Sequence, residues 1–155
     1  MFFKKLVCAF SFIFPCFIFP ALLPAQTAAE LDRLLAAPAV SCAQSAHFVL
    51  SSLADVGAGD NAAAAFASAV EKGWFNKGKS ADDPIAMKDL SYLLMKAFNI
   101  SGGLMYRIFP CPRYAFRTMI SRGFIQGASD PAMKVSGERF LLILGNVLSE
   151  EGGER

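Results

Sequence analysis

Apolar residues recur along much of the chain with the period of a helix. The clearest stripe comprises Met87, Leu90, Leu93, Leu94 and Ala97. A second stripe with similar spacing comprises Phe140, Ile143, Leu144 and Val147. Apolar positions every three or four residues define one face of an amphipathic helix. Because neither helix is stable with such a face in water, we predict that the two meet in a shared core.

Two long stretches of the chain become similar when one is shifted by fifty positions. Residues 62–98 then align with residues 112–148 without a gap, and Gly73-Trp74-Phe75 falls on Gly123-Phe124-Ile125. A repeat of this period usually corresponds to a stacked supersecondary unit. We therefore predict two helix–loop–helix units, each with a glycine–apolar turn after its first helix.

The first helix of each unit has its own apolar face. This face comprises Ala65, Phe66, Ala69 and Val70 in one unit, and Ala115, Phe116, Met119 and Ile120 in the other. Gly73 and Gly123 follow where a glycine in the left-handed conformation ends a helix at little cost. The apolar pairs after these glycines are expected to anchor the turns in the core.

An abbreviated unit precedes the two full ones. Ser41 and Gln44 have the spacing of a capping box, in which each side chain binds the backbone N–H of the other residue. They predict a helix that runs toward Leu53, preceded by a short helix over residues 28–35. The caps expected for later helices are Asp60 or Asn61, and Ser136. The predicted fold class is all-α, with two full units and one abbreviated unit packed as a bundle.

The first 25 residues have the pattern of a secretory signal peptide. Lys4 and Lys5 precede an apolar run over residues 6–23, and the small residue Ala25 follows it. We expect cleavage after Ala25, with Ala29 as the alternative site. The rival interpretation is a retained membrane anchor, since about 20 apolar residues span a bilayer. The prolines within the run favour cleavage.

The chain has four cysteines. Cys8 and Cys16 lie in the signal segment, where lipid attachment is disfavoured because Cys8 comes too early and a proline precedes Cys16. Cys42 and Cys111 remain after export and can pair in an oxidising compartment, which would contribute about 3 to 5 kcal/mol by loop closure. Their spacing fits no disulfide framework, which slightly favours two unpaired thiols.

Charge adds little once the signal segment is set aside. The chain has 15 Lys and Arg and 13 Asp and Glu. Loss of Lys4 and Lys5 leaves the exported chain near neutral, and a nucleic-acid-binding protein needs a strong basic excess. The remaining residues, about 130 in number, suit a single domain. We expect no nucleic-acid partner.

The order of helix, glycine–apolar turn, polar loop and a second helix opened by Ile or Val resembles the S-layer homology (SLH) module. The resemblance covers residues 39–149, after a short helix and linker over residues 26–38 and before an acidic tail over residues 150–155. Segments Gly103–Arg107 and Val135–Arg139 look like those of SLH-like modules in exported envelope proteins of diderm spirochaetes. The resemblance implies a central bundle of second helices and a role in the cell envelope.

The chain departs from the SLH pattern at a functional column. The family's second helix usually carries an arginine that helps to bind an anionic wall glycan, and this column holds Cys42, Met87 and Gly137 here. The family's glutamate column holds Gln44, Asp89 and Arg139. The fold can survive these changes, but binding of a pyruvylated wall polymer is not expected to carry over.

The candidate ligand-binding residues are Trp74, Arg107, Arg113, Arg117 and Arg122. Arg113 and Arg117 are one helical turn apart and should share a face, where an anionic polymer or a lipid head group can dock. The competing interpretation is a solvated helix face. Trp74 can stack on a sugar, but its alignment with Phe124 favours a packing role.

Other motifs have simpler interpretations. His47 is the only histidine, so a catalytic role or a metal site is not expected. Residues 57–62 imitate a dinucleotide fingerprint but follow a helix, which indicates an interhelical loop. Asp82 and Asp83 are expected to lie in a solvated loop or to cap a helix. We expect no cofactor.

Two classes of function follow. The first is an exported, non-catalytic envelope module that binds or organises peptidoglycan, an anionic glycan or an envelope protein, with membrane contact only through an uncleaved signal segment. The second is a small exported hydrolase that uses two carboxylates, for which Asp89 and Glu138, near the starts of corresponding helices, are the pair to test.

Overall fold

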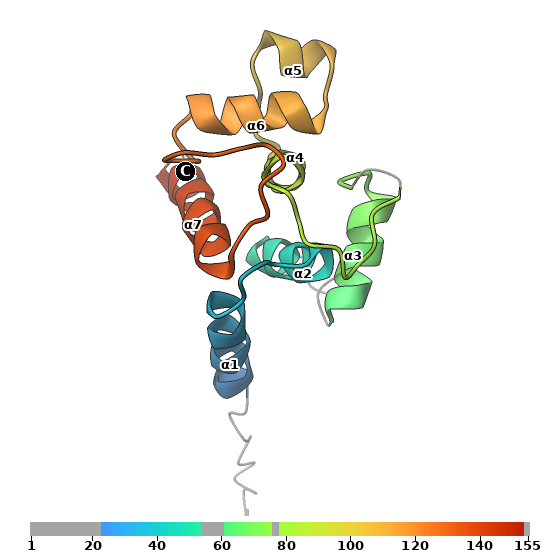
Figure 1. Ribbon diagram of the computed structural model, residues 1–155, viewed down its shortest axis with the longest axis vertical. Coiled ribbons are helices and arrows are strands. Elements are labelled where there is room, and N and C mark those ends of the chain that lie inside the picture. Colours follow the sequence, from blue (N-terminus) through green and yellow to red (C-terminus); the bar gives the residue numbers. More distant parts are fainter. Residues whose placement is uncertain (1–22, 54–60, 76–77, 154–155) are drawn as a thin grey trace, which may run out of the picture.

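The computed structural model describes residues 23–153 apart from residues 54–60 and 76–77 (Figure 1). Its helices are α1 (Leu23–Leu35), α2 (Cys42–Ser52), α3 (Ala62–Glu71), α4 (Met87–Ala97), α5 (Leu104–Ile108), α6 (Pro112–Ser121) and α7 (Gly137–Gly153). Across these described ranges there is no strand, and pairing is limited to the isolated bridges Ser41–Pro84 and Ala86–Lys134. The prediction of an all-α fold is confirmed.

Three short segments meet in the centre, each just before one of the helices α2, α4 and α7. Their backbones form a closed cycle of hydrogen bonds: Val40 donates to Val135, Val135 to Ile85 and Ile85 to Val40, at N···O distances of 2.8, 3.2 and 2.9 Å. All three side chains are fully buried. The cycle therefore places an apolar residue from each segment in the core.

A second set of hydrogen bonds continues this pattern at the helix starts. The amide of Cys42 donates to Asp83, that of Met87 to Met133 and that of Gly137 to Ala37, at 2.9, 2.9 and 3.0 Å. The first N–H groups of a helix have no partner within it. Here a neighbouring segment supplies that partner for α2, α4 and α7, which fixes their relative positions.

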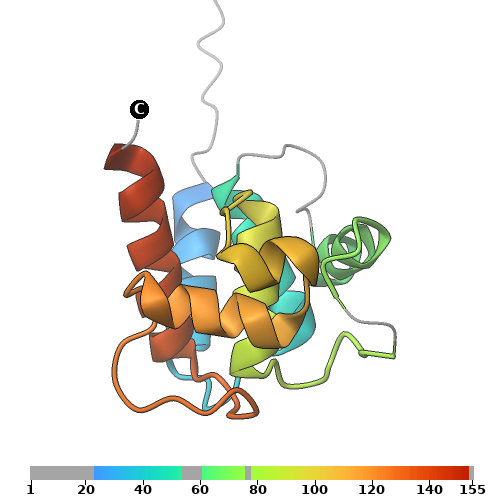
Figure 2. The same cartoon turned by 90° about the horizontal axis from the view of Figure 1, so that it is seen from above.

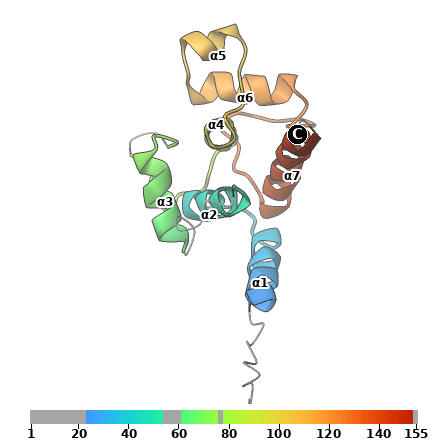
Figure 3. The same cartoon turned by 180° about the vertical axis from the view of Figure 1, so that it is seen from behind.

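The other long helices cover the central three from outside. Helix α3 contacts α2, α6 contacts α4, and α1 contacts α7, while the short helix α5 lies over α6 (Figures 1 and 3). Figure 2 shows the same arrangement from above, with α4 in the middle of the molecule. The core lies between these helices, and its largest fully buried side chains include Phe140, Leu34 and Leu50.

The two predicted units have matching bounds. Helices α3 and α6 begin and end at positions fifty residues apart, and so do the starts of α4 and α7. Gly73 and Gly123 both have positive φ angles, 71° and 80°. The next residue donates to a carbonyl five positions back in each case, Trp74 to Ala69 and Phe124 to Met119. The predicted left-handed glycine turns are confirmed.

The predicted caps are also confirmed. The capping box of α2 is complete, with Ser41 and Gln44 exchanging hydrogen bonds at 3.1 and 3.2 Å. Asn61 accepts from the amide of Ala64 at 2.8 Å at the start of α3. Ser136 accepts from the amide of Arg139 at 3.4 Å at the start of α7. The alternative cap Asp60 lies outside the described residues.

The prediction that Val70 and Ile120 face the core is wrong. Val70 and Ile120 are 45% and 42% exposed, whereas Ala65 and Ala69 are fully buried. At about 100° per residue, Val70 points roughly 140° away from Ala65. Because α3 and α6 each pack mainly against one central helix, their buried face is narrower than the pattern indicated.

The first and last helices, α1 and α7, are both longer than the sequence predicted. Helix α1 begins at Leu23 rather than near Ala28, so it spans both predicted cleavage sites, Ala25 and Ala29. Helix α7 continues to Gly153, into the stretch expected to be a tail. Residues 1–22, which hold most of the predicted signal segment, lie outside the described residues. No helix in the described part is long and apolar enough to cross a bilayer.

Candidate functional site

A groove of about 560 Å³ lies where α4 and α6 meet the turn before α7. Its lining residues are Lys88, Arg113, Phe116, Arg117, Pro131 and Ala132. We call it the cationic groove, because its ionisable lining residues are all basic. None of the ion pairs found among the described residues involves these three side chains.

Local folding brings the groove together. Arg113 and Arg117 lie one turn apart on the exposed side of α6, while Ala115 and Met119 are fully buried on its other side. The amide of Lys88 donates to the carbonyl of Pro131 at 3.0 Å, which holds the turn before α7 against the start of α4.

The acidic residue next to the groove, Asp130, points toward the backbone of its own loop. Asp130 precedes the lining residue Pro131, and its Oδ1 accepts from the amide of Ala132 at 2.7 Å. Asp130 is also the first acidic residue after Asp89 in the sequence. The basic residues between them are Lys96, Arg107, Arg113, Arg117 and Arg122. This part of the chain is therefore strongly basic, although the formal net charge of the whole chain is only +2.

The structure separates the four predicted arginines. Arg113 and Arg117 lie together, as their spacing predicted. Arg107 lies on α5 and does not line the cationic groove. Arg122 follows α6 and contacts Glu150 of α7, with Nη1 3.5 Å from Oε1, and its Nη2 is 3.3 Å from Ser101 Oγ. Sequence reasoning missed Lys88, which joins the groove through a contact distant in sequence.

A pair of loop tethers was also missed. Lys79 Nζ lies 2.9 Å from Asp89 Oδ2, and the Asp89 carboxylate is almost fully buried. Fifty positions later, the Arg139 guanidinium donates to Ser129 Oγ and to the carbonyls of Gln126 and Ala128. The same two positions therefore join the loop to the second helix in both cases. The cation lies in the loop at Lys79 and on the helix at Arg139, a reversal that hides the similarity in the sequence.

The two carboxylates considered for hydrolysis have different surroundings. Asp89 is buried against Lys79, and its hydrogen bond raises the pKa of the Lys79 ammonium. Glu138 is exposed at the start of α7. Asp83, in the pair predicted to lie in a loop, accepts from the Ser80 amide at 2.8 Å, which confirms the loop interpretation for that residue.

The two cysteines in the described part of the chain, Cys42 and Cys111, are free thiols. Cys42 is fully buried at the start of α2, and burial raises the pKa of its thiol to about 11. Cys111 is half-buried and is the N-cap residue of α6. A protonated, buried thiol is chemically inert, so Cys42 serves as a small apolar core residue.

Trp74 and His47 lie outside the cationic groove. Trp74 is half-buried against the core, with Lys72 Nζ 5.1 Å from its ring centroid, and the aligned Phe124 is buried. His47 lines a separate cavity of about 260 Å³ beside Glu30, and its Nε2 lies 3.8 Å from Glu30 Oε2. Among the described residues, no three His, Cys, Asp or Glu side chains are grouped to hold a metal ion.

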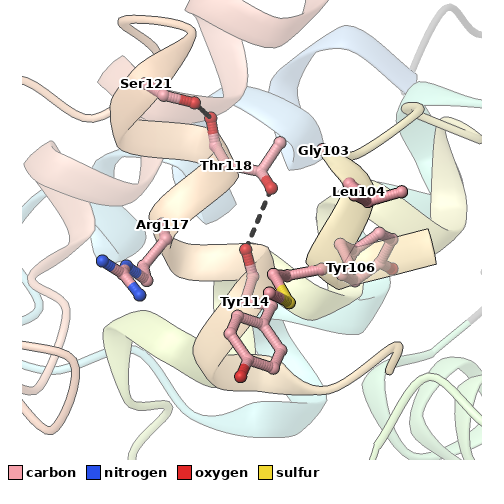
Figure 4. A pocket seen from close by; sticks show the side chains of 8 residues that line it. Gly103, Leu104, Tyr106, Tyr114, Arg117, Thr118 and Ser121 are labelled. Carbon is pink, nitrogen blue, oxygen red and sulfur yellow. Dashed lines mark hydrogen bonds between the residues drawn. The ribbon is translucent and has the colours of Figure 1, made fainter. Parts of the chain in front are cut away.

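A further pocket of about 520 Å³ lies between α5 and α6 (Figure 4). Arg117 is part of its lining as well. Two hydroxyl groups of the lining are turned into their own helix: Thr118 donates to the Tyr114 carbonyl and Ser121 to the Thr118 carbonyl, both at 2.9 Å. Burial raises the pKa of the Tyr106 phenol to about 12. The pocket therefore offers mainly apolar contact.

The described residues form an all-helical fold with a groove whose three ionisable lining residues are basic. No protein-family model, curated protein or solved structure matches the chain.

Proposed function

We propose that the chain is an exported, non-catalytic module of the cell envelope that binds an anionic envelope polymer through the cationic groove. The observation that carries the proposal is the grouping of Lys88, Arg113 and Arg117 around one groove without an acidic lining residue. Basic side chains that share a concave surface raise the local concentration of a polyanion and bind its charged groups with charge-assisted hydrogen bonds.

We further propose that the fold consists of three SLH-like units, α1–α2, α3–α4 and α6–α7. The closed hydrogen-bond cycle through Val40, Ile85 and Val135 supports this assignment, because each residue holds the same place before a central helix. The matching glycine turns and loop tethers of the second and third units add to it. In this assignment the abbreviated first unit has α1 as its outer helix.

The binding mode proposed differs from that of SLH modules in general. The positions of the family's arginine column, Cys42, Met87 and Gly137, are all buried at the starts of the central helices. A ligand has no access to them. The basic groups available to a polymer lie instead on the next residue, Lys88, and on the outer helix α6, and the cationic groove supports a ligand with repeated negative charge.

The compartment is part of the same proposal. Its support is the pattern of the first 25 residues, with two lysines, an apolar run and a small residue before the expected cleavage site. An exported module meets anionic polymers in the envelope, so the groove and the signal pattern are consistent with each other.

A co-sedimentation assay tests the proposal. The purified protein is incubated with insoluble peptidoglycan that retains its anionic polymers, and the bound fraction is measured at increasing salt. We expect saturable binding that weakens with salt, because the Debye length falls from about 10 Å at 0.1 M to about 3 Å at 1 M. The same supernatants are assayed for soluble sugars, which a hydrolase releases.

A pair of charge-matched variants makes the assay specific. Arg113→Gln/Arg117→Gln removes two charges from the groove, and Arg33→Gln/Lys72→Gln removes two exposed charges elsewhere. The first variant should lose most of the binding and the second should keep it. Equal losses in both variants would mean that net charge, rather than the groove, causes binding. Release of sugar would overturn the non-catalytic assignment.

A further inference from the structure

The short helix α5 exposes an unusual group of apolar side chains. Leu104, Met105, Ile108 and Phe109 are 70%, 56%, 56% and 62% exposed, and no residue of α5 is buried. They are the most exposed large apolar side chains in the described part of the chain. The others are scattered over α1, α3, α6 and α7. Grouped apolar exposure marks an interaction surface, whereas scattered exposure is ordinary.

The position of α5 makes this group a protrusion. The α5 residue Tyr106 turns inward, with its ring 6.5 Å from that of Tyr92 in an edge-to-face contact. Leu104 and Ile108 lie one turn apart on α5, and Phe109 follows as its C-cap residue. Figures 1 and 3 show α5 at the end of the molecule that lies opposite α1. Leu104 and Met105 also line the pocket between α5 and α6, but all four apolar side chains remain more than half exposed.

Basic residues surround this protrusion. Arg107 lies within α5, and Arg113 and Arg117 lie on the adjacent α6. The stretch between Asp89 and Asp130 contains no acidic residue. Exposed apolar side chains beside basic ones fit a partner that has negative charge at its surface and an apolar interior. An anionic lipid bilayer has charged head groups and an apolar interior. Protein elements that bind such bilayers carry basic residues beside exposed apolar ones.

We propose that α5 docks the protein onto an anionic bilayer, with Leu104, Met105, Ile108 and Phe109 inserted below the head groups and Arg107 at the level of the phosphates. This surface adjoins the cationic groove, and Arg113 and Arg117 lie near both, but the inference does not depend on polymer binding. It also departs from the expectation that membrane contact is limited to the signal segment.

A fluorescent reporter tests insertion directly. Trp74 is the only tryptophan, and the aligned position holds Phe124. Trp74→Phe/Phe109→Trp therefore moves the single indole to the tip of α5 with a conservative change at each site. We expect a blue shift of its emission with phosphatidylglycerol-containing vesicles and quenching by lipids brominated in the upper acyl chain. Vesicles of phosphatidylcholine alone should produce a much smaller change.

Flotation with the same vesicles tests the residues. Leu104→Ser/Phe109→Ser should lower the partition coefficient of the exported chain, residues 26–155, by at least about tenfold, because each lost apolar contact weakens insertion. Arg107→Gln should lower it about fivefold, since one basic residue near an anionic surface contributes on this scale. The control Leu142→Ser/Leu148→Ser alters two exposed leucines of α7 and should leave partition unchanged.

Several outcomes would overturn the proposal. They are an absence of vesicle binding, equal binding to neutral vesicles, and equal losses in the α5 and α7 variants. A dimer that Leu104→Ser/Phe109→Ser converts to a monomer would assign the surface to a second copy of the chain instead. Retention of polymer binding by Leu104→Ser/Phe109→Ser would separate this surface from the cationic groove.

Discussion

Replacement of Gly137 by alanine tests the contact between α1 and α7. Gly137 is the first residue of α7, and a Cβ placed on it would lie 1.5 Å from the Leu34 carbonyl oxygen and 2.5 Å from its carbonyl carbon. Non-bonded carbon atoms normally approach to roughly 3.5 Å. The obstacle is backbone, so no side-chain rotation relieves it. Either the end of α1 separates from the start of α7, or the contact remains and strains both segments.

The loss of stability follows from what this separation breaks. Leu34 is 1% exposed, and its burial contributes about 1.5 to 3 kcal/mol. The hydrogen bond from the Gly137 amide to Ala37 contributes about 0.5 to 1.5 kcal/mol. If α1 stays in place instead, overpacking typically costs about 1 to 3 kcal/mol. Separation of α1 would therefore cost about 2 to 4.5 kcal/mol and overpacking about 1 to 3 kcal/mol, so we expect the free energy of unfolding to fall by at least about 1 kcal/mol.

Urea unfolding followed by circular dichroism at 222 nm measures this loss, and α7 contains its own control. A Cβ on Gly145 would meet nothing within 4 Å. Gly145→Ala should therefore stabilise the protein by about 0.5 to 1 kcal/mol, because alanine is the better helix former. If the two glycine variants differ by less than about 1 kcal/mol, the close contact at Leu34 does not exist and the reasoning fails.

A double-mutant cycle distinguishes separation of α1 from strain with α1 still docked. Leu34→Ala alone should cost about 2 to 5 kcal/mol, as for other buried leucines. If Gly137→Ala has already released α1, the Leu34 substitution should cost little in that background, and the two effects will not add. Full additivity would indicate that α1 stays docked and that strain accounts for the whole loss.

Three further predictions address the caps, the tether and the thiols. Ser41→Ala should lower the free energy of unfolding by about 1 kcal/mol in the same urea assay, because it breaks the capping box of α2; an unchanged midpoint would contradict this. Since Asp89 raises the pKa of Lys79, their pair stabilises the fold below the ordinary Lys pKa of 10.5, and this contribution should fade as pH rises above it. Asp89→Asn should abolish that part of the alkaline loss, and identical pH profiles would refute it. A thiol reagent at neutral pH should label Cys111 and spare Cys42 until urea unfolds the protein; mass spectrometry that finds both labelled at once would refute the buried position of Cys42.

The features that the sequence predicted well are local ones. A glycine that ends a helix and a hydroxyl that caps one act through residues three to five positions away, so Gly73, Gly123 and Ser41 were identified from spacing alone. The width of a buried face is not local. It depends on how many helices surround a given one, which is why Val70 and Ile120 were assigned to the core and are exposed.

Only the local part of the candidate site was predicted from the sequence. Arg113 and Arg117 share a face because they are four residues apart on one helix. Lys88 joins them through a backbone hydrogen bond to Pro131, and Arg122 contacts Glu150 across the end of α7. Both contacts connect residues distant in sequence, and no periodicity indicates them. The exposed side of α5 was also missed, because five helical residues are too few to show a pattern.

Sequence similarity also did not reveal that α1 packs against α7. Helix α1 has no recognisable likeness to α3 or α6, yet it contacts α7 as they contact α2 and α4. The Gly137 amide reaches back to Ala37, so the last proposed unit binds the first. An open solenoid differs, since its units contact only their neighbours in sequence and the array can lengthen. Here each central segment needs both others to satisfy its backbone groups, and the entropy of closing the long loop between Ala37 and Gly137 is offset only when all three are in place. The three proposed units should therefore fold as one cooperative body, and the number of units is fixed by closure.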